Sequence, residues 1–253
     1  MINAIMQHLT YDDPPSYSNY PSYRQYLRKA SHYSCAYCTI SESESPGATF
    51  NIEHFRPEAL FRHLSSTCTN LRYACPRCNS YKGKLWIPIE EGCIRDCENC
   101  VSKICHQNIE RFIDVLSEEP STMLYLGEDN KLYASSGSKP ADYTIKYLRL
   151  NRDQLVKLRY VRRFMENWQN ELLERKEAAE KRLATIKKEQ QSFLAKNLSS
   201  ASSKEETYIN AMKTLYDLLV LLAEQSLVQI EEEIRKLNQL QAYRSGSDTK
   251  IEE

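Results

Sequence analysis

Two Cys-x-x-Cys pairs constrain this chain more than any other feature. Cys35 and Cys38 form the first pair, and Cys75 and Cys78 form the second, with 36 residues between the pairs. Each pair on a tight turn presents two thiolates to one tetrahedral Zn²⁺, which takes sulfur ligands at about 2.3 Å. We therefore expect one structural zinc site that ties together the two ends of this segment.

A second group of cysteines follows closely: Cys93, Cys97, Cys100 and Cys105. The chain start lacks the basic region and long apolar run of a signal peptide, and no window is apolar enough for a spanning helix. We therefore expect a cytoplasmic protein without a membrane partner. The cytosol keeps thiols reduced, which favours metal binding over disulfides. This group thus favours a second zinc site, with His106 as a substitute ligand, although its spacing is not diagnostic.

The charge balance limits how the chain can contact nucleic acid. The 253 residues carry 34 Lys and Arg against 34 Asp and Glu, for a formal net charge of zero. The chain as a whole therefore lacks the basic field of a DNA-coating protein, and any contact must be local. We expect phosphate contacts from Lys82 and Lys84, and from a basic run at 146–163 that includes Arg152 and Arg159. The alternative for each is a solvated helix face.

Five segments are expected along the chain. A tyrosine-rich arm with a short helix capped by Ser22 covers 1–34, and the cysteine segment covers 35–106 with a strand at 49–55. A connector at 107–150 contains a β-hairpin, in which MLYL and KLYA flank a Gly-Glu-Asp-Asn turn. Two long helices, the first capped by Asn151, fill 151–243. The tail at 244–253 is expected to fray.

The two long helices carry apolar residues at spacings of three and four, so we expect an antiparallel helical hairpin. The stripe on the second helix, formed by Leu215, Leu218, Leu219, Leu222, Leu227 and Ile230, is broader than one neighbouring helix covers. We therefore expect the hairpin to be an interaction platform, for a partner protein or for a homo-oligomer. The alternative is that these helices belong to the core of the chain.

Four polar residues in the cysteine segment carry the chemistry expected of a catalytic site: Glu53, His54, Asn70 and Asn79. A histidine titrates near neutral pH, so His54 is the candidate general base for activating water. Glu53 and Asn79 offer hard oxygen donors suited to Mg²⁺ or Mn²⁺. Because neighbours on a strand point to opposite faces, Glu53 and His54 do not automatically share one site.

The order of these residues resembles the HNH endonuclease family. NIEHFRP carries the acidic residue and histidine, CTNLRYAC carries Asn70, and CPRCNSYKGK carries Asn79 beside the second cysteine pair. The resemblance implies a ββα-metal fold, with Asn70 orienting the ring of His54 and with Glu53 and Asn79 holding the catalytic ion. It departs from the commoner pattern by having Glu53 for Asp and Asn79 for the final His. The expected fold class is α+β, mainly α: a small zinc-braced ββα-metal nuclease module, then the helical hairpin.

A weaker resemblance covers more of the chain. The layout, with TIKYLRLNRDQLVKLR leading into helices, is similar to the PtuB-like HNH proteins of Septu and retron-associated anti-phage defence. This similarity implies a nuclease subunit that works with a PtuA-like ABC-type ATPase on DNA or RNA, including tRNA. The alternative is a non-catalytic zinc-ribbon protein that binds nucleic acid or acts as an adaptor.

Overall fold

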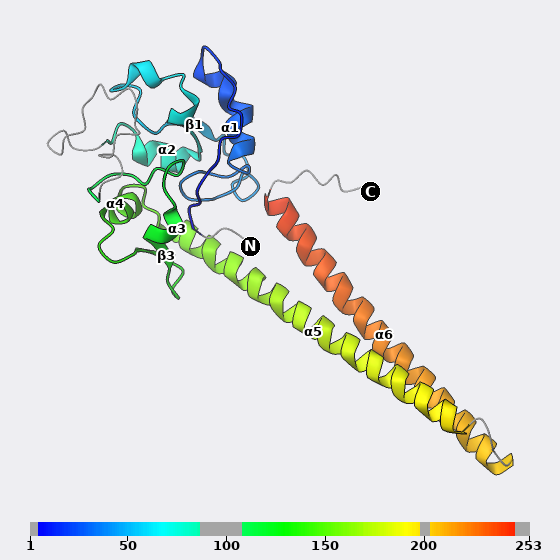
Figure 1. Ribbon diagram of the computed structural model, residues 1–253. Coiled ribbons are helices and arrows are strands. Elements are labelled where there is room, and N and C mark those ends of the chain that lie inside the picture. The colour runs from blue at the N-terminus through cyan, green and yellow to red at the C-terminus, as the bar shows by residue number, and fades with distance from the viewer. Residues whose placement is uncertain (1–4, 87–107, 198–202, 246–253) are drawn as a thin grey trace. The chain divides into compact units, whose positions relative to one another are not determined.

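The computed structural model describes residues 5–86, 108–197 and 203–245 (Figure 1). The chain divides into two compact units, the N-terminal unit (Met1–Arg163 with Ala242–Glu253) and the helical hairpin (Phe164–Gln241). The predicted second zinc site at Cys93–Cys105 lies outside the described residues. None of the helices in the described part is both long and apolar enough to cross a bilayer.

The N-terminal unit begins with the predicted short helix. A 3₁₀ turn, η1 (Tyr20–Tyr23), leads directly into α1 (Arg24–Ala30). The side chain of Asn19 accepts a hydrogen bond from the Ser22 N–H, so Asn19 provides the cap that we expected from Ser22. Pro21 at the start of the turn favours this order, because its fixed φ suits a first helical position.

A two-stranded antiparallel sheet lies at the centre of the cysteine segment. Strand β1 (Asn51–His54) pairs with β2 (Leu71–Ala74) from Asn51 opposite Ala74 to His54 opposite Leu71. All four residues of β2 are buried, and α1 contacts this strand. Helix α2 follows β2 and contacts β1. The connection between the strands holds two 3₁₀ turns, and the remaining bounds are η2 (Arg62–Leu64), η3 (Cys68–Asn70) and α2 (Pro76–Lys82).

The connector contains the predicted hairpin. Strands β3 (Leu124–Leu126) and β4 (Leu132–Ala134) pair antiparallel, between α3 (Pro120–Met123) and α4 (Lys139–Tyr147). The prediction of Asn151 as a helix cap is wrong. Its side-chain amide instead bonds the backbone of Leu132, accepting from the N–H at 2.7 Å and donating to the carbonyl at 2.8 Å. Asn151 therefore fastens β4.

The two predicted long helices are present as α5 (Asp153–Asn197) and α6 (Ser203–Ser245) (Figure 1). Within the helical hairpin, polar pairs fix their antiparallel order: Lys176 with Glu231 at 2.8 Å, Lys187 with Glu224 at 2.7 Å, and Gln190 with Asp217 at 2.6 Å. Partners later on α5 meet residues earlier on α6. The apolar periodicity thus produces the antiparallel pairing that we expected.

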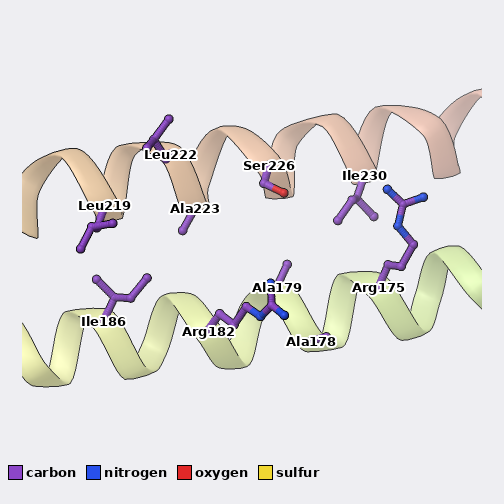
Figure 2. Close-up of a pocket in the computed structure, with 10 residues that line it drawn as sticks. All are labelled: Arg175, Ala178, Ala179, Arg182, Ile186, Leu219, Leu222, Ala223, Ser226 and Ile230. Atoms are coloured by element: carbon purple, nitrogen blue, oxygen red, sulfur yellow. The ribbon is translucent and has the colours of Figure 1, made fainter.

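The contact between α5 and α6 is narrow. Leu172, Ile230 and Leu237 are the buried hydrophobic residues among those described in the helical hairpin. Small side chains, Ala179 and Ala223, leave an open groove of about 470 Å³ between the helices, as Figure 2 shows. Four of the six residues of the predicted stripe are exposed: Leu215, Leu218, Leu219 and Leu222.

Candidate metal centre and active site

The four cysteines of the two pairs form one buried cluster. Their sulfur atoms all lie within 4.8 Å of one another, and the Cys38 and Cys75 sulfurs are 3.7 Å apart. A tetrahedral Zn²⁺ with bonds of about 2.3 Å requires sulfur separations of about 3.8 Å. The cluster therefore fits a zinc ion, as the spacing predicted.

Local structure explains how each pair reaches the cluster. An isolated bridge between Ser34 and Ser41 closes the loop that carries Cys35 and Cys38. Cys75 caps α2, and its sulfur accepts a hydrogen bond from the Cys78 N–H at 3.4 Å. Both pairs thus sit on tight turns at the same end of the small sheet.

The thiols perturb one another because they are buried and close. Burial and neighbouring sulfurs raise the pKa of Cys35, whereas hydrogen bonds from the other three thiols lower the pKa of Cys75. Thiols whose pKa is raised hold their protons while no metal is bound. A bound Zn²⁺ replaces these protons, since thiolates are the form that binds metal.

His54 ends β1 and is half-buried. Its Nε2 lies 3.0 Å from the carbonyl oxygen of Ser65. A carbonyl oxygen can only accept, so this contact requires a proton on Nε2 and makes Nδ1 the acceptor of a neutral ring. The backbone of the loop between the strands therefore fixes both the orientation and the tautomer of His54.

Asn70 does not hold the ring of His54 as the resemblance implied. Its side chain is buried, accepts from the Arg56 N–H at 2.9 Å, and donates to the Arg56 and Leu64 carbonyls at 3.1 and 3.3 Å. These bonds fasten the loop that follows β1. Asn70 thus acts on His54 through the loop, since Leu64 directly precedes the residue whose carbonyl bonds the ring.

Glu53 points into the interior, opposite to His54, as strand geometry requires. It is 3% exposed, and its Oε1 lies 2.6 Å from the Lys82 Nζ while its Oε2 accepts a hydrogen bond from the Tyr37 hydroxyl. Lys82 also donates to the His54 carbonyl at 2.8 Å. The cation beside Glu53 is therefore the ammonium of Lys82, and both carboxylate oxygens already have partners.

The pKa shifts around this buried pair follow from its surroundings. Burial lowers the pKa of Lys82, and the adjacent Glu53 carboxylate opposes that shift. Burial and the same carboxylate raise the pKa of Tyr37, which therefore remains the hydrogen-bond donor. The three side chains form a network that joins the first cysteine loop, β1 and α2.

Residues 35–85 match the family model described as HNH endonuclease. This is the HNH region of the chain. It contains the four-cysteine cluster, β1, β2, α2 and the four residues expected to be catalytic. The match covers about a fifth of the sequence, and no curated protein and no solved structure matches the chain.

The remaining residues expected to bind metal or phosphate differ in how far they are exposed to solvent. Asn79 is half-buried on α2 and Lys84 is exposed, so both are accessible from solvent. Lys82 is 0% exposed, which argues against its expected phosphate contact. Arg159 is 2% exposed, and its guanidinium donates to the Leu150 carbonyl at 2.6 Å, so it is a structural residue.

Arg152 also departs from the prediction of a nucleic-acid contact. Its guanidinium nitrogens lie 3.6 Å from the Cys38 sulfur and 3.8 Å from the Cys78 sulfur. Nearby, Arg162 donates to the carbonyl of Thr39 at 2.8 Å. The basic run at 146–163 therefore does not form a continuous surface stripe, because Arg152 and Arg162 turn toward the first cysteine loop and Arg159 is buried.

Sequence reasoning missed two partners of His54. One is the Ser65 carbonyl, which no residue type signals. The other is Tyr20, whose ring lies edge-on to the imidazole with centroids 4.9 Å apart. Tyr20 precedes the HNH region by 15 residues, and the only signal was the density of tyrosines in the arm. The arm thus supplies one wall beside the candidate base.

Proposed function

We propose that the HNH region hydrolyses phosphodiester bonds of nucleic acid, with His54 as the general base. The observation that carries this proposal is the contact between His54 Nε2 and the Ser65 carbonyl, within a segment that matches the HNH endonuclease family. The contact leaves Nδ1 as the acceptor for a proton from water. A positioned base of this kind typically contributes about 10²- to 10⁴-fold to the rate.

The zinc cluster has a structural role in this proposal. Four cysteine ligands complete the coordination of Zn²⁺, so no open position remains for water or substrate. The ion would stabilise the turns that carry α2 and the first cysteine loop. The proton transfer then belongs to His54, and not to the zinc.

A catalytic Mg²⁺ or Mn²⁺ does not fit the expected ligand pair in this structure. The resemblance implies Glu53 and Asn79, but Glu53 already binds Lys82 and Tyr37 with both oxygens. We therefore assign no step to such an ion. Dependence on Mg²⁺ or Mn²⁺ stays a prediction, which running the cleavage assay below with and without each ion would check.

The test compares His54→Ala with His63→Ala in the full-length, zinc-loaded protein. His63 is an exposed histidine of the same HNH region, so it controls for loss of an imidazole. Labelled plasmid, single-stranded DNA and total RNA are the substrates, each with Mg²⁺ or Mn²⁺. We expect His54→Ala to lose about 10²-fold or more of the cleavage rate, with zinc content and circular dichroism unchanged. His63→Ala should cleave as the wild type does.

Equal cleavage by His54→Ala and wild type would overturn the assignment of the base. The alternative function, a non-catalytic zinc-ribbon protein, predicts a different result: wild type binds the nucleic acids but cleaves none of them. The same substrates decide whether the target is DNA or RNA. Lys84 is the exposed basic residue for which we retain the predicted phosphate contact.

A second, more specific proposal concerns the biological setting, and it rests on the similarity to PtuB-like proteins. We infer a cytoplasmic nuclease subunit of a bacterial anti-phage complex, with an ABC-type ATPase bound to the exposed leucines of α6. Walker motifs in a neighbouring reading frame are the first check. Co-purification of that ATPase with wild type, but not with a Leu218→Gln/Leu222→Gln variant, would support the assignment. Equal co-purification would place the ATPase elsewhere.

A further inference from the structure

Arg152 lies outside the HNH region yet touches its zinc cluster. One guanidinium nitrogen is 3.6 Å from the Cys38 sulfur and 3.8 Å from the Cys78 sulfur, and the other is 3.9 Å from Cys78. One planar group thus spans a cysteine from each pair. Cys38 and Cys78 are 40 residues apart in the sequence, and Arg152 follows Cys78 by 74 more.

The charge of a filled site explains why a cation belongs there. Zn²⁺ with four thiolates carries a net charge of −2, and all four cysteines are at most 4% exposed. A buried, uncompensated charge is costly, and charged N–H donors are among the strongest groups that offset it. Arg152 supplies one full positive charge with donors directed at two of the four sulfurs.

Backbone carbonyls and an aromatic ring also hold the Arg152 guanidinium in place. Its Nη1 also donates to the Leu148 and Arg149 carbonyls at 3.2 and 3.3 Å, just beyond the end of α4. The ring of Tyr81, on α2, lies under Arg152 at 5.8 Å and under Arg149 at 4.9 Å. Arg152 therefore links the cluster, α2 and the backbone that leads into α5.

We propose that Arg152 is the counter-cation of the zinc centre and retains the metal by hydrogen bonding to the Cys38 and Cys78 sulfurs. These bonds offset part of the negative charge on the two sulfurs within the buried site, which stabilises the zinc-bound form. Outer-shell partners of this kind typically change metal affinity by about 10- to 100-fold. The proposal requires zinc in the four-cysteine cluster but does not require cleavage by His54.

The experiment measures zinc release from full-length protein into excess EDTA, with a chromogenic indicator and without nucleic acid. The variants are Arg152→Gln, which removes the charge, and Arg152→Lys, which keeps the charge but loses the planar pair of donors. Arg149→Gln is the matched control, because it removes a positive charge over the same tyrosine ring. Zinc content of each purified protein is first measured by elemental analysis.

We expect Arg152→Gln to release zinc about 10- to 100-fold faster than wild type. Arg152→Lys should fall between the two, and Arg149→Gln should match wild type. If Arg152→Gln does not fold, Arg152→Lys decides, and release at the wild-type rate would overturn the proposal. Equal acceleration by Arg149→Gln would also overturn it, because general loosening of the connector would then explain the effect. A wild type without zinc would overturn it too, whether or not the protein cleaves nucleic acid.

Discussion

The two units differ in which side chains they bury and which they expose. The N-terminal unit buries full charges: Lys82 pairs with Glu53, and Arg72 pairs with Asp114 at 2.5 Å, in an interior that also holds the cysteine cluster. The helical hairpin instead exposes hydrocarbon, with Leu222 61% exposed and Leu218 52% exposed. Charged side chains are almost never fully buried unless they are paired, and large exposed apolar patches on soluble proteins commonly mark contact surfaces.

This difference indicates which interactions each unit depends on. The N-terminal unit depends on specific partners, because a buried charge without its partner is strongly destabilising. The helical hairpin depends on a narrow apolar seam and on exposed ion pairs such as Lys176 with Glu231, which contribute little individually. Perturbations that remove a metal or a buried partner should therefore act on the first unit alone.

Zinc removal should give the largest effect. Binding of a structural zinc is worth about 10–16 kcal/mol in zinc-finger peptides, which exceeds or matches the whole stability of a typical domain at about 5–15 kcal/mol. We expect chelation, or Cys75→Ser, to unfold the N-terminal unit and to leave the helical hairpin folded. Circular dichroism should then retain most of the helical signal.

The two tryptophans allow each unit to be followed separately. Trp86 packs against Phe55 and Phe61 in the N-terminal unit, and Trp168 lies on the hairpin. In a Trp168→Phe background, Trp86 emission should shift to the red on chelation. In a Trp86→Phe background, Trp168 emission should stay constant. Simultaneous changes of both signals would contradict the independence of the units.

The parts predicted from the sequence are those set by local spacing. Two Cys-x-x-Cys turns, alternation along β1, and apolar residues at threes and fours each depend on nearby residues, and the corresponding elements are present. The functions of Asn70, Lys82 and Arg152 were predicted less well. Each depends on a partner more than ten residues away in the sequence: Arg56 for Asn70, Glu53 for Lys82, and Cys38 for Arg152.

Lys82 illustrates why the sequence was insufficient. Helix α2 has seven residues, too few for a periodic pattern to distinguish its buried face from its exposed face. A lysine next to Gly83 at a helix end is therefore equally consistent with a solvated side chain. Only the register of β1 and the position of Tyr37 show that the buried Glu53 carboxylate lies beside the Lys82 ammonium.

A double-mutant cycle on Glu53 and Lys82 should give an intermediate effect. Glu53→Gln and Lys82→Met should each destabilise the N-terminal unit by about 3–5 kcal/mol, because each leaves the other charge buried without its partner. The double variant should lose less than the sum of the two. Urea unfolding followed by Trp86 emission, in the Trp168→Phe background, gives the free energy of unfolding of the parent, the two single variants and the double variant.

The same cycle on the exposed pair of Lys176 and Glu231 is the control from the helical hairpin. Each of those changes should cost less than about 1 kcal/mol. Additive losses at Glu53 and Lys82 would show that the two side chains do not interact as the structure places them. Loss of cleavage by Glu53→Gln with unchanged stability would instead restore the metal-ligand role that the family resemblance implies.

The smallest effect is expected on the exposed face of α6, where Leu218→Gln and Leu222→Gln should change the free energy of unfolding by no more than about 0.5 kcal/mol. Leu218 and Leu222 are more than half exposed, so their replacement opens no buried cavity. Ile230→Ala, at a buried position of the same helix, should cost about 2–5 kcal/mol. Thermal unfolding followed by Trp168 emission, in the Trp86→Phe background, compares the stabilities of these three variants.

A large loss of stability in Leu222→Gln would mean that another surface covers the exposed face of α6. Repeating the measurement at several protein concentrations identifies that surface, because association of two copies makes the unfolding temperature depend on concentration. A loss that is independent of concentration would indicate cover from within the chain. The expected small and concentration-independent effect would leave these leucines without a role in the stability of the isolated chain. They would then be available to contact a different protein, as proposed above.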